Sequence, residues 1–167
     1  MNLQALPEEA LKEILALTEA KKRLDLQEEA QNLFMPFAHH VYENFIEGRH
    51  HRVIAEKLER VARGELKRLI INMPPRHSKS EFASFLMPAW FLGRNSKLKI
   101  IQATHNTELA VRFGRKVRDL IDDPAYKEIF PNTHLKEDNK GAGKWQTSDG
   151  GEYFAAGVGA AVTGRGA

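Results

Sequence analysis

Residues 66–80 read LKRLIINMPPRHSKS and set the architecture that we expect for the chain. The run ending at Met73 is apolar and contains two adjacent isoleucines, and it is too short for a helix and suited to a buried strand. Pro74 and Pro75 end the run, and a helical pattern begins at Glu81. We therefore expect a strand, a tight loop and a helix, an order that suits anion binding at the start of the helix.

The residues after the loop complete this expectation. Residues 81–92 predict a helix that Pro88 kinks and Gly93 ends. Residues 98–104 predict a second buried strand, which begins about 31 residues after the first, the size of one βαβ unit. We therefore predict that the two strands are parallel and joined by a right-handed crossover.

Two further elements are expected toward the C-terminus. Asn106 is a suitable cap for a helix that runs to about Ile121. Residues 131–151 are rich in loop formers, and Asp149-Gly150-Gly151 predicts a hairpin turn between residues 144–147 and 152–156.

The N-terminal part has a helical pattern. Helices are predicted over residues 7–24, 26–33, 41–46 and 49–61. Pro36 is expected to break or redirect the chain, and Gly64 follows the last of these helices. We divide the chain into a helical region, residues 1–64, and a core, residues 65–167.

Composition excludes several classes of function. The 167 residues contain no Cys, which excludes disulfides, thiolate metal sites and cysteine catalysis. No apolar run approaches the roughly 18 residues of a membrane span, and we expect no secretory signal. The net charge is +3, but residues 49–79 hold nine basic and three acidic residues. This block suits a polyanion such as nucleotide phosphate or nucleic acid, although a solvated basic helix face is an equal alternative.

The loop has part of a known phosphate-binding pattern, G-x-x-x-x-G-K-[ST]. Lys79 is placed to reach the β- and γ-phosphates, and Ser80 supplies a hydroxyl for Mg²⁺. The amides of residues 77–80 would form the cradle. Met73 and Ser78 stand where the pattern has glycine. The alternative interpretation is a β-turn with an incidental Lys-Ser pair.

Three stretches resemble the large terminase subunit of tailed bacteriophages and prophages: residues 48–95, residues 100–121 and, more loosely, GVGAAVTGRGA at 157–167. The most specific element is MPPRH-x-KSE, where the family usually has glycine at x and this chain has Ser78. The resemblance covers about residues 36–167. It implies an ATP-driven motor that moves double-stranded DNA into a procapsid, with a P-loop NTPase-like parallel sheet flanked by helices.

The resemblance also sets expectations for context. It implies ATP and Mg²⁺ as cofactors, the small terminase subunit and the portal protein as partners, a homo-oligomeric ring, and the cytoplasm of the bacterial host. The family continues into a Walker B strand and a nuclease domain. We therefore expect an ATPase fragment that is truncated before the Walker B strand, without the nuclease domain, and impaired in turnover.

Site residues follow from the same resemblance. Lys79 would neutralise the phosphates, and Arg165 would act as a finger in a neighbouring subunit's site. Arg76 would sense the γ-phosphate, with a surface residue as the equal alternative. The nucleotide-binding residues would be Pro75, Arg76, His77, Ser78, Lys79, Ser80 and Glu81. Glu81 lies in a first helical turn, so a capping carboxylate is the alternative to a catalytic one.

Other side chains have competing interpretations. A basic cluster would track DNA phosphates or form a solvated helix face: Arg112, Arg115, Lys116 and Arg118. We expect no metal site at the pairs His39-His40 and His50-His51. Adjacent residues of a helix point about 100° apart, so the two rings of a pair cannot easily bind one ion. The aromatic residues Phe82, Phe85, Trp90 and Phe91 are expected in the core.

Two other functions remain open from the sequence. One is a degenerate, prophage-derived module that binds nucleotide or DNA without catalysis, which Ser78 favours. The other is a different P-loop ATPase such as a helicase. ATPase assays with and without DNA, on a longer chain, distinguish these possibilities.

Overall fold

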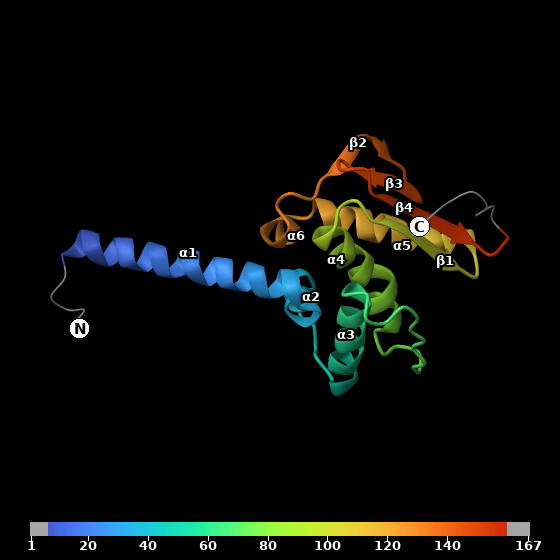
Figure 1. The fold of residues 1–167 in the computed structure, drawn as a ribbon, viewed down its shortest axis with the longest axis horizontal. Coiled ribbons are helices and arrows are strands. Elements are labelled where there is room, and N and C mark those ends of the chain that lie inside the picture. The colour runs from blue at the N-terminus through green and yellow to red at the C-terminus, as the bar shows by residue number, and fades with distance from the viewer. Residues whose placement is uncertain (1–6, 160–167) are drawn as a thin grey trace.

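The computed structural model describes residues 7–159 and shows a helical body with a sheet on one side (Figure 1). The helices precede and interleave with the strands as follows: α1 (Glu8–Asn32), α2 (Phe34–Val41), α3 (Arg49–Ala62), the π-helix η2 (Glu81–Leu86), α4 (Met87–Arg94), α5 (Thr107–Asp122) and α6 (Pro124–Ile129). The strands are β1 (Lys99–Thr104), β2 (Leu135–Lys140), β3 (Lys144–Thr147) and β4 (Glu152–Gly157). None of the helices in this described part is long and apolar enough to span a bilayer.

The sheet is mixed, which overturns the prediction of a P-loop NTPase-like parallel sheet. Its order is β1-β4-β3-β2; β1 and β4 are parallel, whereas β3 is antiparallel to both of its neighbours. The expected parallel pair of residues 66–73 with residues 98–104 is absent from the described part, where the parallel neighbour of β1 is β4. β1 lies at the sheet edge and is only partly covered, so the prediction of a buried strand there is also wrong.

Residues 66–73 are extended, but in the described part of the chain they belong to no strand. Leu69, Ile71 and Met73 pack against the hydrophobic core, whereas Ile70, pointing the other way, is 85% exposed. The prediction of a buried strand over these residues is therefore wrong, although exposure alternates from Leu69 to Met73. Its apolar side is covered by helices, and its backbone does not join the sheet.

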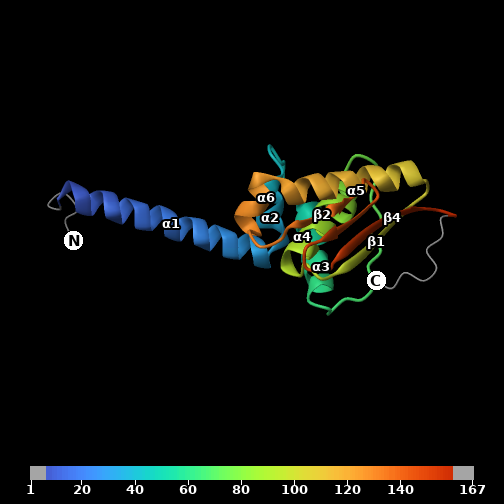
Figure 2. The same cartoon turned by 90° about the horizontal axis from the view of Figure 1, so that it is seen from above.

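Helix α5 lies along the sheet and links it to the other helices (Figure 2). Asn106 caps α5 as predicted, since its side-chain oxygen accepts a hydrogen bond of 2.7 Å from the amide of Leu109. Gly114 allows a close approach: a Cβ there would lie 2.7 Å from the carbonyl oxygen of Ala142. The indole of Trp145 donates to the carbonyl of Gly114 at 3.0 Å and stacks on Tyr153.

The helical region shares one core with the segment after the loop. Phe34 packs edge-on against both Phe82 and Trp90, and the indole of Trp90 donates to the carbonyl of Ala30 at 2.9 Å. The prediction that the aromatic residues near the loop belong to the core is confirmed: Phe82, Phe85 and Trp90 are buried and Phe91 is partly buried. Helices α2, α3, η2 and α4 therefore form one packed unit that holds the loop.

Helix boundaries depart from the predictions in three places. The two helices expected over residues 7–24 and 26–33 form one helix, α1. Pro36 lies inside the first turn of α2, where a missing amide costs no intrahelical bond, and residues 42–46 are not helical. Gly93 lies within α4, which ends one residue later.

Candidate functional site

Two residues of the 74–80 loop have left-handed backbone conformation. Arg76 has φ 64° and Ser78 has φ 59°. L-residues adopt this region at a cost, and alternation with right-handed neighbours turns successive amides toward one side of the chain. The ring of His77 lies 2.9 Å from the carbonyl oxygen of Pro75 through Nδ1. The loop is thus a tight, concave turn of the kind that receives anions.

The turn leads directly into a helix. Ser80 is helical (φ −72°, ψ −32°), and the amide of Phe82 donates to the carbonyl of Ser78 at 2.9 Å. The helix continues through η2 into α4 without a break. The first amides of a helix have no intrahelical acceptor and carry the positive end of its dipole. Lys79 and Ser80 are exposed at this end.

Glu81 is held by the neighbouring helix. Its carboxylate pairs with the ammonium of Lys116 at 2.8 Å, and that ammonium also lies 4.3 Å from the centre of the Phe85 ring. Glu81 makes no side-chain cap at the start of η2, so its expected capping role is not seen. Both partners are about one-third exposed, so the pair fixes the position of the helix more than it stabilises the fold.

The basic residues of α5 do not act as one cluster. Lys116 is engaged with Glu81, and Arg118 pairs with Asp119 at 2.6 Å. Arg112 and Arg115 are exposed on the surface of the helix. Of the four predicted DNA-binding residues, these two have the exposure that phosphate contact requires.

Two neighbouring cavities flank Met73. The loop cavity, about 450 Å³, is lined by residues 73–81. The helix cavity, about 590 Å³, lies between α3 and residues 69–73. Because Met73 lines both, the two cavities adjoin each other along the chain.

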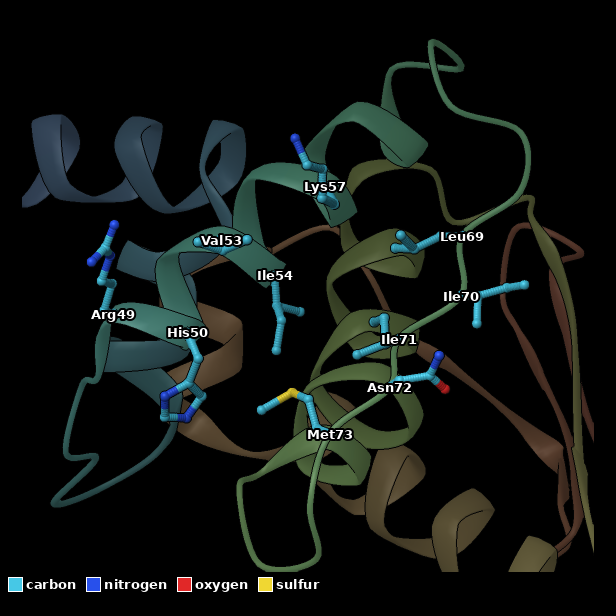
Figure 3. A pocket seen from close by; sticks show the side chains of 10 residues that line it. All are labelled: Arg49, His50, Val53, Ile54, Lys57, Leu69, Ile70, Ile71, Asn72 and Met73. Atoms are coloured by element: carbon cyan, nitrogen blue, oxygen red, sulfur yellow. The ribbon is translucent and has the colours of Figure 1, made fainter.

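The helix cavity has an apolar floor and a basic rim (Figure 3). Ile54 and Met73 point into the space between α3 and the extended segment, whereas Ile70 points away from α3. Arg49 and Lys57 contribute cations from the α3 side. The sequence analysis predicted the helix over residues 49–61 but not the cavity, because the cavity forms only where residues 69–73 return alongside α3.

Three histidines lie beside these cavities. The ring centres of His50 and His51 are 3.9 Å apart and those of His50 and His77 are 5.8 Å apart, so the expectation that adjacent helical histidines point apart is wrong here. Gly48 donates its amide to Nδ1 of His51 at 2.9 Å, which closes the N-terminus of α3 and draws this ring back toward the turn.

His51 is 5% exposed and stacks on Phe82. Burial, followed by the nearby charge of His50, lowers the pKa of His51 below its ordinary value. A neutral ring is also what the hydrogen bond from Gly48 requires. Within residues 7–159, no group of three His, Asp or Glu side chains is arranged to hold a metal ion.

The remaining predicted site residues divide by position. The structure brings Pro75, Arg76, His77, Ser78, Lys79, Ser80 and Glu81 together around the loop cavity. Arg165, the predicted finger, lies outside the described residues. Comparison of the chain with known protein families, characterised proteins and solved structures finds no significant match.

Proposed function

We propose that the 74–80 loop binds the phosphates of Mg-ATP and that the chain contributes the ATP-binding part of a DNA-packaging motor of the terminase type. The observation that carries the proposal is the pair of left-handed residues, Arg76 and Ser78, directly before Lys79 and Ser80 at the start of a helix. This arrangement combines a concave turn, free amides and a cation at one point.

The residues present fit such a ligand. The exposed ammonium of Lys79 would neutralise the terminal phosphates, and the exposed hydroxyl of Ser80 would be available to Mg²⁺. The helix cavity beside Met73 is apolar and of a size for a small planar group, so we assign it to the base of the nucleotide. Arg49 and Lys57 also line this cavity, and the ammonium of Lys57 pairs with Glu56 at 2.8 Å.

The test is nucleotide binding by Lys79→Ala, measured by calorimetry with ATP and Mg²⁺. We expect binding to be lost while the circular dichroism spectrum is unchanged, because Lys79 is exposed and makes no core contact. Lys67→Ala is the matched control, since Lys67 is also exposed on the segment that precedes the loop. If folded K79A and K67A bind ATP with equal affinity, the proposed phosphate site is wrong.

Binding without turnover is a second candidate, and a specific observation favours it. Among the nine described residues that line the loop cavity, Glu81 is the one acidic residue, and its carboxylate is paired with Lys116. Hydrolysis needs a group that orients the attacking water. A chain that binds ATP but releases no phosphate, with or without double-stranded DNA, would favour this candidate, and DNA-stimulated phosphate release would favour the motor.

A further inference from the structure

Helix α1 extends away from the body of the molecule (Figure 1, Figure 2). It has 25 residues, and only its C-terminal end is anchored. Gln27 and Gln31 donate to the carbonyl of Ile129 at 3.2 and 2.6 Å, and Ala30 is buried. Every residue from 12 to 26 is exposed.

Of the five positions that continue the anchored face toward the N-terminus of α1, four are apolar and the fifth is Glu13. At about 100° per residue, positions spaced alternately by three and four share one side of a helix. Gln27 and Gln31, which contact α6, therefore share their side of α1 with Leu17, Ala20 and Leu24. We call these three residues together with Ala10 the Leu17 stripe. Leu17 and Leu24 are 64% and 62% exposed.

The charges beside the stripe are arranged for a second, reversed helix. Glu9, Ala16 and Arg23 are spaced by seven residues and follow one edge of the stripe. Ala16 lies midway between Glu9 and Arg23. When two α1 helices pack antiparallel with Ala16 against Ala16, the same edges of the two helices face each other, and each Glu9 meets Arg23 of the other copy.

The charge along the helix supports the same direction. Residues 7–15 hold three acidic residues and one basic residue, and residues 16–24 hold one acidic and three basic residues. Antiparallel packing therefore brings opposite net charges together over the whole exposed length. Glu13 lies on the stripe itself, and in this arrangement it comes about half a helical turn along the axis from Lys21 of the other copy.

We propose that the exposed part of α1 is a self-association surface that binds α1 of a second copy of this chain, antiparallel, through the Leu17 stripe and two Glu9–Arg23 pairs. In the dimer, each copy covers the exposed apolar side chains of the other copy's α1, which the body of that other copy does not contact. This surface is independent of the proposed nucleotide site.

The test is the mass of the full chain in solution, measured over a concentration series by analytical ultracentrifugation. We expect a reversible shift from the 18.9 kDa chain to twice that mass. Arg23→Glu and Glu9→Arg each raise the dissociation constant by about tenfold or more, because each dimer contains the pair twice and like charges then meet. The double variant E9R/R23E restores the dimer.

Neighbouring residues on the other side of α1 provide matched controls. Lys22→Glu makes a comparable charge change one residue from Arg23, and we expect it to leave the dimer intact. Leu17→Glu abolishes the dimer, whereas Leu15→Glu, at a residue 61% exposed on the opposite side, does not. Circular dichroism confirms that each variant keeps its helix.

Three results would overturn the proposal. The first is a monomer at every concentration. The second is a dimer that R23E and K22E weaken equally, or that L15E and L17E weaken equally. The third is a double variant E9R/R23E that stays monomeric, which would exclude the antiparallel direction.

Discussion

Ser78 has a backbone conformation that glycine adopts more easily than serine. Its φ of 59° lies in the left-handed region, which side chains with a Cβ adopt at a cost. We predict that Ser78→Gly stabilises the protein. The related change Ser80→Gly, two residues along the chain, has the opposite effect, because Ser80 has ordinary helical angles of −72° and −32°.

The magnitude follows from two opposing contributions. Glycine removes a strain of roughly 1–2 kcal/mol at a left-handed position. It also makes the unfolded chain more flexible, which costs about 0.4–1 kcal/mol. The net stabilisation for S78G is therefore about 1 kcal/mol. At Ser80 no strain is relieved, and the helix loses roughly 0.5–1 kcal/mol.

Thermal unfolding separates these outcomes. For a chain of this length, about 1 kcal/mol corresponds to about 2–4 °C in Tm. We expect Tm to rise for S78G and to fall for S80G, as followed by differential scanning fluorimetry and by urea unfolding at constant temperature. If S78G lowers Tm as much as S80G does, the left-handed conformation at Ser78 is not a source of strain and the assignment of the turn is wrong.

Two further predictions concern the packing around the loop. Gly93→Ala places a methyl group against the ring of Phe130, so we expect a loss of about 1–3 kcal/mol in urea unfolding, and an unchanged midpoint would contradict this packing. The pKa of His51 in the folded protein lies below its ordinary value of 6.5. At pH values between the folded and the unfolded pKa, the unfolded state therefore binds more protons than the folded state. The free energy of unfolding should therefore be steady above about pH 6.5 and fall as the pH drops below it. His51→Asn keeps an acceptor for the amide of Gly48 and should flatten that fall, whereas the same slope in both proteins would exclude His51 as its source.

Features that depend on neighbouring residues were predicted well from the sequence. The cap at Asn106 is confirmed, as is the glycine after α3, since Gly64 has φ 75°. The hairpin at residues 149–151 joins β3 and β4 as expected. In each case the residue that gives the signal also makes the local structure, through the side chain of Asn106 or the backbone freedom of glycine, so no distant part of the chain is needed.

Features that depend on distant contacts were not predictable in the same way. β2 has the polar sequence LKEDNK, and its pairing with β3 identifies it as a strand. One local prediction also failed. The break expected between residues 24 and 26 is absent, because nothing in that stretch prevents a helix. The ion pair between Glu81 and Lys116 joins residues 35 apart, and neither position signals the other in the sequence.

The extended segment before the loop shows how this distinction affects the candidate site. Its short apolar run predicts a buried strand, which is wrong, because a strand also needs a neighbour that supplies hydrogen bonds. In the described part the segment does not pair with the edge strand β1, and its apolar side packs against the helical core. The loop is therefore held mainly from its C-terminal side, where Phe82 and Trp90 are buried and Lys116 secures Glu81. Lys79 and Ser80, the two side chains proposed to contact phosphate and Mg²⁺, lie on that side, next to the helical core.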